Sequence, residues 1–410
     1  MKLFLHAHAT HPDGHMALAL AAAQIDAQRG RADTVSQPTL GWLYLTDHLA
    51  AQAPALLADA RRRWPGTAWV GAVGVGIAGN GIEYFDEPAL SLMLADLPRE
   101  QFRVFSGVQP LAAGDGFAPA TAQVHTDPAT ADLAELIDEL AGRTSHGYLF
   151  GGLASAQDVA GSASPCLHIA DGVFEGGLSG VAFSAEVALV SRVSQGCQPV
   201  SPARRITSAE RNLVLTLDDQ PALDCLLSDL GLDERAPREA PPRLRQTLVG
   251  LSDGHDDTPT RPGQFGPETR VRHLVGLDPA RRGIAIGDHA PIGAQLAFCR
   301  RNTEAARRDL VRICSEIREE LEPETLPRET AIALSGAAAD GASHPARRIA
   351  GAVYVSCAGR GGPHFGAPSA ELAIVRHALG DVPLVGFFAN GEIARRQLYG
   401  YTGVLTVFTG

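Results

Sequence analysis

Short apolar segments alternate irregularly with longer amphipathic segments along the chain. The short segments are rich in Val, Ile, Leu, Phe and Tyr and are bounded by Gly or Asp, which is typical of strands. They lie at residues 68–75, 147–151, 173–184, 187–193, 331–335, 350–356, 383–388 and 402–408. Because strands and helices are interleaved, the pattern predicts a mixed α/β fold (mixed α+β) with sheets and helices in both halves of the chain.

Three amphipathic segments predict helices. Each places its apolar residues three or four positions apart and has a recognisable start or stop signal. They lie at about 133–140 behind Asp127-Pro128, at 306–321 behind Asn302 or Thr303, and at 369–379 ahead of Gly380.

Length and composition favour two domains. A chain of 410 residues exceeds what one hydrophobic core normally supports, and an apolar content of 45% is enough for two cores. No apolar run approaches the about 20 residues needed to cross a bilayer, and Leu3–Leu5 is too short for a secretory signal. The six cysteines are scattered without a Cys-x-x-Cys pair, which favours free thiols. We therefore expect a cytoplasmic protein without membrane insertion.

The texture of the chain changes after residue 232. Residues 233–267 are rich in Pro, Arg, Asp, Gly and Glu around one apolar piece at Leu248–Leu251, which predicts a long exposed loop. We place the domain boundary before this loop, near Leu217 to Pro221. The expected domains are therefore residues 1–218 and 219–410.

The two halves share a short likeness. Val70–Gly74 leads to Asn80-Gly81 and a nearby glutamate, as Leu384–Gly386 leads to Asn390-Gly391 and a glutamate, and a strand-like segment follows in both cases. This suggests two similarly sized halves related by internal duplication. The hypothesis requires that the two segments occupy related places in the fold.

The charge balance bears on possible partners. A formal net charge of −11 argues against nucleic acid, because nucleic-acid binders concentrate Lys and Arg on a basic face. Residues 74–79 spell Gly-x-Gly-x-x-Gly, but Asn80-Gly81 follows where a dinucleotide site needs a helix. We therefore expect neither nucleic-acid binding nor a dinucleotide site.

One arginine and one glutamate stand out near the C-terminus. Arg360 and Glu392 lie on two glycine-marked turns, each at the end of an apolar strand. A guanidinium binds a carboxylate bidentately and a carboxylate accepts hydrogen bonds from an ammonium, so the two could hold the ends of an amino acid. The alternative is a structural ion pair, because buried arginines and glutamates are usually paired.

These residues lie in a segment that resembles a known family. Ser356–Gly361 with Val382–Ile393 resembles the C-terminal half of the FIST domain, a ligand-sensing module of signal-transduction proteins, and three upstream segments resemble the same half: His273–Pro279, Ile284–Asp288 and Phe298–Asn302. Four earlier segments resemble the N-terminal half of the FIST domain: Trp69–Gly74, Tyr148–Ser155, Gly176–Phe183 and Ser194–Pro199. These are loose glycine patterns whose order makes the match specific, and together they cover the chain from about Trp42 onwards.

The chain departs from the family pattern in two respects. After the Gly-Glu-Ile turn, Ala394–Leu398 leads straight into Tyr399, where the family has a longer, glycine-rich connection. The two sensing halves also account for all 410 residues, whereas the family is often fused to an output module. The resemblance therefore implies a signal that passes to a separate protein such as a kinase, cyclase or chemoreceptor.

The resemblance implies small-molecule binding, with amino acids as the expected ligands. We expect Arg360 to hold the ligand carboxylate and Glu392 its ammonium. Asn390 and Gly391 supply contacts from the turn, and the remaining candidates line the pocket: Tyr401, Phe365, His364, Cys357 and, as a second anion ligand, Arg301.

Three alternatives remain open at this stage. Some members of the family resemble haem-binding nitric-oxide sensors, for which His364 is the candidate proximal ligand. A cysteine hydrolase would use Cys357 with His364, and a metal-dependent one would use the early histidines His6, His8, His11 and His15. Because no catalytic constellation is complete, the sequence favours binding over catalysis, with no resident metal or cofactor.

Overall fold

The computed structural model describes residues 2–30, 33–111, 116–159, 162–163, 165–232, 240–252, 265–266, 268–321 and 349–410. The chain forms two compact units of mixed helices and strands, which confirms the predicted fold class. Unit 1 comprises Met1–Ser194, Leu310–Leu398 and Thr402–Gly410, and unit 2 comprises Gln195–Asp309 and Tyr399–Tyr401. These spatial units do not follow the division at residues 218 and 219, because the chain enters unit 2 after Ser194 and returns after Asp309.

Unit 1 is built from three six-stranded sheets. The first has the order β1 (Leu5–Thr10), β6 (Ala89–Ala95), β2 (Leu40–Thr46), β3 (Ala68–Gly74), β12 (Leu167–Ala170), β13 (Val173–Glu175). The second has the order β7 (Phe102–Phe105), β14 (Leu178–Phe183), β8 (Thr121–Thr126), β9 (Tyr148–Leu153), β26 (Glu392–Arg395), β27 (Gln397–Tyr399). The third has the order β15 (Leu189–Ser194), β28 (Gly403–Thr409), β24 (Ile349–Cys357), β25 (Leu384–Ala389), β4 (Gly76–Gly79), β5 (Ile82–Phe85).

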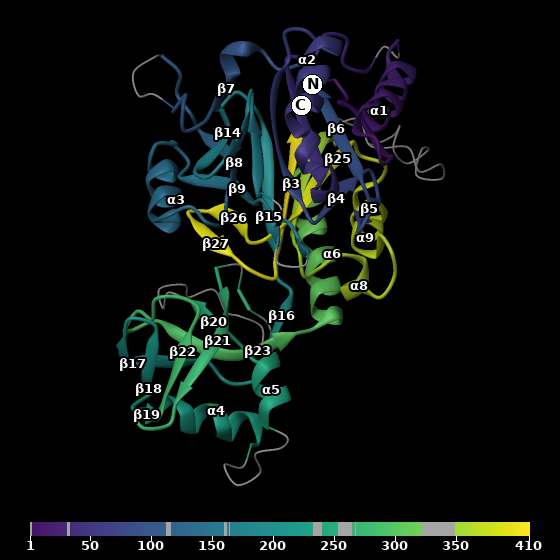
Figure 1. Ribbon diagram of the computed structural model, residues 1–410. Coiled ribbons are helices and arrows are strands. Elements are labelled where there is room, and N and C mark those ends of the chain that lie inside the picture. The colour runs from purple at the N-terminus through teal and green to yellow at the C-terminus, as the bar shows by residue number, and fades with distance from the viewer. Residues whose placement is uncertain are drawn as a thin grey trace, which may run out of the picture. The chain divides into compact units, whose positions relative to one another are not determined.

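The three sheets follow one plan. In each, a central strand pairs in parallel with the next long strand and antiparallel with a returning strand: β2 with β3 and β6, β8 with β9 and β14, β24 with β25 and β28. We call these units repeat 1, repeat 2 and repeat 3. The hairpin that follows the parallel pair leaves its own sheet, so β4–β5 extends the sheet of repeat 3, β12–β13 that of repeat 1 and β26–β27 that of repeat 2. Figure 1 shows the yellow β26 and β27 beside the teal β9.

A glycine marks the same place in all three repeats. Gly71, Gly151 and Gly386 sit on the second strand of each parallel pair, opposite Leu43, Val124 and Tyr354. A Cβ added at these glycines would lie 1.8, 1.9 and 1.7 Å from the carbonyl oxygen of the facing residue. The two strands therefore approach each other too closely for any side chain, and the shared glycine gives a common reference point for the repeats.

The internal likeness seen in the sequence has a structural counterpart. Gly71 and Gly386 are equivalent, and the strands that follow, β6 and β28, are equivalent too. The Asn-Gly steps are not equivalent: Asn80-Gly81 closes the β4–β5 hairpin, whereas Asn390-Gly391 joins β25 to β26. The duplication is also threefold within unit 1, with β8–β14 as the copy that the sequence pattern did not reveal.

Crossover helices accompany the parallel pairs. They are α2 (Ala53–Arg63), α3 (Leu133–Gly142) and α9 (Ala370–Leu379), in repeats 1, 2 and 3. The other helical segments are α1 (Gly14–Gln28), α4 (Ala222–Leu230), α5 (Ala240–Gln246), α6 (Thr303–Leu321), α8 (Gly362–Phe365) and the 3-10 turns Asp47–Gln52 and Arg99–Gln101. The helices predicted near 133–140, 306–321 and 369–379 are thus confirmed, and Ala305 N donates to the Asn302 side chain at 2.8 Å as a cap.

Buried side chains from all three repeats meet inside unit 1. Tyr44 of repeat 1 and His125 of repeat 2 each pack against Phe387 of repeat 3, with ring centroids 5.3 and 5.7 Å apart. The Gln123 side chain links this group to Trp42. Its Oε1 accepts a hydrogen bond from Trp42 Nε1 at 2.7 Å, and its Nε2 donates one to Tyr44 Oη at 2.7 Å. Burial lowers the pKa of His125 to about 3, so this histidine is a neutral member of the core.

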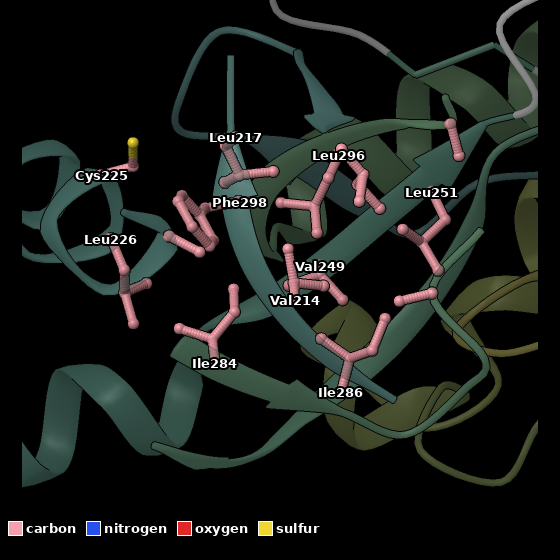
Figure 2. Close-up of a cluster of buried hydrophobic side chains, with 14 of the residues drawn as sticks. Val214, Leu217, Cys225, Leu226, Val249, Leu251, Ile284, Ile286, Leu296 and Phe298 are labelled. Carbon is pink, nitrogen blue, oxygen red and sulfur yellow. The ribbon is translucent and has the colours of Figure 1, made fainter. Parts of the chain in front are cut away.

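Unit 2 is a closed antiparallel barrel. Its strands are β23 (Gln295–Arg301), β17 (Arg204–Glu210), β18 (Leu213–Leu217), β22 (Gly283–Ile286), β21 (Arg270–Asp278) and β20 (Leu248–Ser252), and β20 pairs back with β23. The short strands β16 (Cys197–Pro199) and β19 (Gln220–Pro221) pair with β23 and β18. Figure 2 shows Val214, Val249, Ile284, Ile286 and Phe298 pointing toward one another inside the barrel.

The apolar piece at Leu248–Leu251 differs from its prediction. It forms buried strand β20 of the barrel instead of part of an exposed loop, because its side chains complete the barrel core. The rest of the predicted loop is only partly described, and the expected strand at 331–335 lies outside the described residues. The two-residue strands Asp158–Val159 and Ser162–Ala163 complete the list of elements. Within the described chain, no helix combines the length and apolar character needed to span a membrane.

Candidate functional site

Arg360 follows strand β24 by one short turn and is buried, with 3% of its surface exposed. Its amide donates to the Cys357 carbonyl at 2.7 Å, which turns the chain back at the strand end. Its guanidinium lies over the ring of Phe365, 5.3 Å from the centroid, and donates to the Ser194 carbonyl and hydroxyl at 3.2 and 3.3 Å. Burial lowers the pKa of Arg360, but the neighbouring Glu371 carboxylate raises it above its ordinary value.

Glu371 is the acidic partner of this arginine. Its Oε1 lies 2.8 Å from Arg360 Nε and 2.7 Å from Nη2, and both side chains are at most 1% exposed. The carboxylate also accepts hydrogen bonds from Tyr354 Oη at 2.7 Å, Ser356 Oγ at 3.1 Å and Gly361 N at 2.9 Å. The pair therefore connects the start of α9 to the end of β24, and both oxygens of the Glu371 carboxylate accept hydrogen bonds.

Glu83 comes from repeat 1 but binds the helix starts of repeat 3. Its Oε2 accepts a hydrogen bond from Gly362 N at 2.6 Å, and its Oε1 accepts from Glu371 N and Leu372 N, both at 3.1 Å. Its own amide donates to Ser369 Oγ at 3.0 Å. Glu83 thus supplies the N-terminal cap of α9 from a hairpin far away in sequence.

Glu392 opens strand β26 and has no exposed surface. Its Oε2 accepts hydrogen bonds from Thr402 N at 3.0 Å and Thr402 Oγ1 at 2.7 Å. Its Oε1 accepts none from any residue that the structure describes. An ionised carboxylate oxygen that is buried without a donor is costly, so Glu392 is the most unusual polar group of the set.

Arg360, Glu371, Glu83 and Glu392 form what we call the charged cluster. It contains three carboxyl groups and one guanidinium, so it would carry excess negative charge if all were ionised. Burial raises the pKa of Glu392 to about 8, against the hydrogen bonds from Thr402 and the charge of Arg360. Burial likewise raises the pKa of Glu83 to about 7. Both carboxyl groups therefore titrate near neutral pH.

The raised pKa of Glu392 predicts a pH-dependent stability. The folded state binds this proton more tightly than the unfolded state, so its stabilising effect is complete below about pH 4.5 and is lost as the pH rises through 8. Glu392→Gln is a permanently neutral substitute. At about pH 9 it should raise the free energy of unfolding by roughly 3 kcal/mol relative to the native chain, with little effect at about pH 5.

Urea unfolding at both pH values, followed by tryptophan fluorescence, measures this difference. The control is Glu139→Gln, the same chemical change on an exposed carboxylate of α3. Equal effects of Glu392→Gln at the two pH values would contradict a titrating Glu392.

The repeats show that the fold does not require these charges. Arg360 is counted from the residue that faces the shared glycine, and Glu371 and Glu392 are counted from the glycine itself. In repeat 1 the corresponding residues are Leu49, Leu56 and Ile77, which are all fully buried. In repeat 2, Thr130 and Leu136 take the places of Arg360 and Glu371. His168 takes the place of Glu392, because it pairs with Ala72 as Glu392 pairs with Gly152 and Ile77 with Phe387, and burial lowers its pKa so that it is neutral. The same framework is thus built once with an apolar core and once with neutral groups. The charges of repeat 3 are an addition to the framework and mark it as the candidate site.

The other residues of unit 1 that the sequence predicts for the site also lie in repeat 3. Phe365 is buried under Arg360, and His364 is half-buried with its ring edge-on to Phe365. Cys357 is half-buried at the end of β24. Asn390 N donates to the Leu153 carbonyl at 3.1 Å, and the Gly391 carbonyl accepts from Leu153 N at 2.9 Å, so this turn uses its backbone to join β9.

Tyr401 and Arg301 belong to unit 2 and contact each other there. The Arg301 guanidinium lies 5.5 Å from the centroid of the Tyr401 ring, and Tyr401 Oη lies 2.8 Å from His273 Nε2. The nine predicted residues therefore fall into two groups, seven in unit 1 and two in unit 2.

Sequence reasoning missed Glu371, Glu83 and the two hydroxyl residues Ser194 and Thr402. Glu371 had a signal, because it shares the buried helical stripe of Leu372 and Val375. No signal in the sequence connects Glu83 with Arg360, because the position of Glu83 depends on a hairpin that joins the sheet of another repeat. For Arg360, the predicted structural ion pair exists, but its partner is Glu371 instead of Glu392.

Two family models match the chain. One, described as the FIST N domain, matches residues 39–220, and the other, described as the FIST C domain, matches residues 222–395. The chain is 29% identical over 411 residues to the uncharacterized protein Rv0628c of Mycobacterium tuberculosis. It is 30% identical over 418 residues to the uncharacterized protein Mb0898c of Mycobacterium bovis. Both alignments cover 97% of this chain and 97% of the relative.

Proposed function

Because this chain belongs to the FIST family, we propose that it is a sensory protein that binds a small ligand at the charged cluster of repeat 3. FIST domains are associated with sensing in signal transduction. We further propose that the protein acts in the cytoplasm and that a separate kinase, cyclase or chemoreceptor receives its signal.

The observation that carries this proposal is the open oxygen of Glu392. A fully buried carboxyl group keeps Oε1 without a donor among the described residues, at a position where the other repeats have Ile77 and His168. Stability alone favours an apolar side chain there, since apolar replacements of buried charges are often neutral or stabilising. A ligand that supplies a hydrogen-bond donor or a positive charge to Oε1 accounts for the glutamate.

The chemistry of the cluster favours a ligand with an ammonium group beside a carboxylate, which is the arrangement of an amino acid. The ammonium would bind Glu392 Oε1. The carboxylate would bind the Arg360 guanidinium, whose contacts to Ser194, at 3.2 and 3.3 Å, are longer than those to Glu371 and are the ones a ligand would replace. Phe365 would form an apolar wall.

Binding of such a ligand should depend on pH. An ammonium binds the ionised form of Glu392, whose pKa is about 8, so binding below that pH releases one proton. We expect the affinity for the recognised amino acid to rise about tenfold per pH unit up to pH 8 and then level off. Glu392→Gln should lower the affinity at pH 8 by at least about tenfold, since a neutral amide no longer attracts the ammonium.

Calorimetric titration with each common amino acid, in buffers of different ionisation enthalpy, measures both the affinity and the proton released. Glu139→Gln serves as the matched control, with unchanged binding. Binding of an amino acid without pH dependence would contradict the role of Glu392. A haem absorption band in the purified protein would instead support the alternative that uses His364.

A further inference from the structure

The chain passes between the two units at places next to the charged cluster. It leaves unit 1 after Ser194, and it returns to unit 1 at Thr402 after the short segment Tyr399–Tyr401. Ser194 and Gly403 are paired residues on the neighbouring strands β15 and β28, so these two crossings start from the same end of one sheet. We call Tyr399–Tyr401 the strap.

Both crossing residues are held by the charges of the cluster. Arg360 donates to the carbonyl and the hydroxyl of Ser194. Glu392 accepts from both the amide and the hydroxyl of Thr402, at 3.0 and 2.7 Å. The corresponding residues of repeat 1 are Ala9 and Ala89, which have no side-chain donor. Arg360 and Glu392, the two side chains proposed to bind the ligand, thus also bind the chain where it enters and leaves unit 2.

The last residue of the strap, Tyr401, is anchored to the barrel. Tyr401 adjoins Thr402, its hydroxyl lies 2.8 Å from His273 Nε2, and the Arg301 guanidinium lies over its ring. Its backbone has φ +63°, a left-handed conformation that a tyrosine rarely adopts. Such a conformation persists only where contacts on both sides hold it, here Thr402 on one side and His273 with Arg301 on the other.

We propose that the strap transmits the state of the ligand site to the outer face of the barrel, where Tyr401, His273 and Arg301 form the responding group. A ligand carboxylate at Arg360 replaces the contacts to Ser194, and a ligand ammonium at Glu392 Oε1 competes for the carboxylate charge that holds Thr402 at Oε2. The strained Tyr401 then has one anchor fewer and leaves His273. This inference rests on the proposed function, and it assigns to Tyr401 and Arg301 a role in output rather than in ligand binding.

The experiment uses variants in place of a ligand, so that it does not depend on ligand identity. Amide hydrogen exchange of Gly400, Tyr401 and Thr402 is measured by NMR in the full chain, together with the imidazole signals of His273. Glu392→Ala removes Oε2, the acceptor of both Thr402 hydrogen bonds. The control, Ile77→Ala, removes the buried side chain at the corresponding place in repeat 1. Thr402→Val, which removes only the hydroxyl bond, serves if Glu392→Ala does not fold.

We expect exchange in the strap to be at least about tenfold faster in Glu392→Ala and severalfold faster in Thr402→Val, with no such change in Ile77→Ala. Tyr401→Phe, which removes the hydroxyl that contacts His273, gives the reference spectrum. The His273 signals of Glu392→Ala should move toward those of Tyr401→Phe. Strap exchange within twofold of the native chain, or equal acceleration in Ile77→Ala, overturns the inference. If amino-acid binding is nevertheless lost in Glu392→Gln, the proposed function stands and only the transmission role is wrong.

Discussion

Arg360→Met should destabilise unit 1 by about 3–5 kcal/mol, because it leaves the Glu371 carboxylate buried without its counter-charge. Methionine keeps the length and much of the volume of the arginine, so the effect reports the charge. Urea unfolding followed by tryptophan fluorescence measures this unit alone, since all three tryptophans, Trp42, Trp64 and Trp69, lie in unit 1.

A compensating variant tests this explanation. In Arg360→Met combined with Glu371→Gln, the neutral amide oxygen still accepts the hydrogen bonds of Tyr354 and Ser356, and the unpaired charge of residue 371 is removed. We expect the double variant to recover most of the lost stability. A double variant as unstable as Arg360→Met would show that the guanidinium acts through its contacts with Ser194 and Phe365 instead.

Gly386→Ala should prevent unit 1 from folding, or cost more than about 5 kcal/mol. The added Cβ would lie 1.7 Å from the Tyr354 carbonyl oxygen, which is backbone and cannot move aside without separating β24 from β25. This strand pair positions both Arg360 and the turn that leads to Glu392, so the ligand site should be lost as well.

Gly107→Ala is the matched control, because a Cβ there meets nothing within 4 Å. It should change the stability of unit 1 by less than about 1 kcal/mol. Soluble expression and tryptophan fluorescence of the two variants make the comparison. A folded, stable Gly386→Ala protein would contradict the close approach of the two strands.

The sequence predicted individual elements well where one segment carried its own signal. The helix near 369–379 has a cap residue, an apolar stripe and a terminating glycine, and α9 lies at Ala370–Leu379. Strand β25 is a continuous apolar run between a proline and an Asn-Gly turn, and it too lies where predicted. Local signals of this kind depend on neighbouring residues alone.

The arrangement of the repeats could not be predicted in the same way. The exchange of hairpins between sheets depends on pairings such as Val385 with Gly79, which no local pattern encodes. For this reason the sequence pointed to Arg360 and Glu392 but not to Glu83, which reaches them from repeat 1. The sequence predicts a loop where strand β20 lies, because the apolar run of this strand is short and its flanks are polar.

The repeats also explain why buried charge is informative here. Repeat 1 has Leu49, Leu56 and Ile77 at the places of Arg360, Glu371 and Glu392, within the same molecule and the same strand framework. The comparison therefore separates what the framework needs from what repeat 3 adds. A buried ion pair alone is weak evidence for function, but an ion pair with an additional open carboxylate oxygen, absent from two equivalent copies, is a specific feature.

A triple variant that combines Arg360→Met, Glu371→Gln and Glu392→Gln tests whether the charged cluster binds the ligand, with Glu83 left in place as the cap of α9. Its binding of each common amino acid is measured by calorimetry at pH 8, beside the native chain. We expect the native chain to bind at least one amino acid and the triple variant, folded by tryptophan fluorescence, to bind none of them. Equal binding by the two proteins would show that the ligand site lies outside the charged cluster.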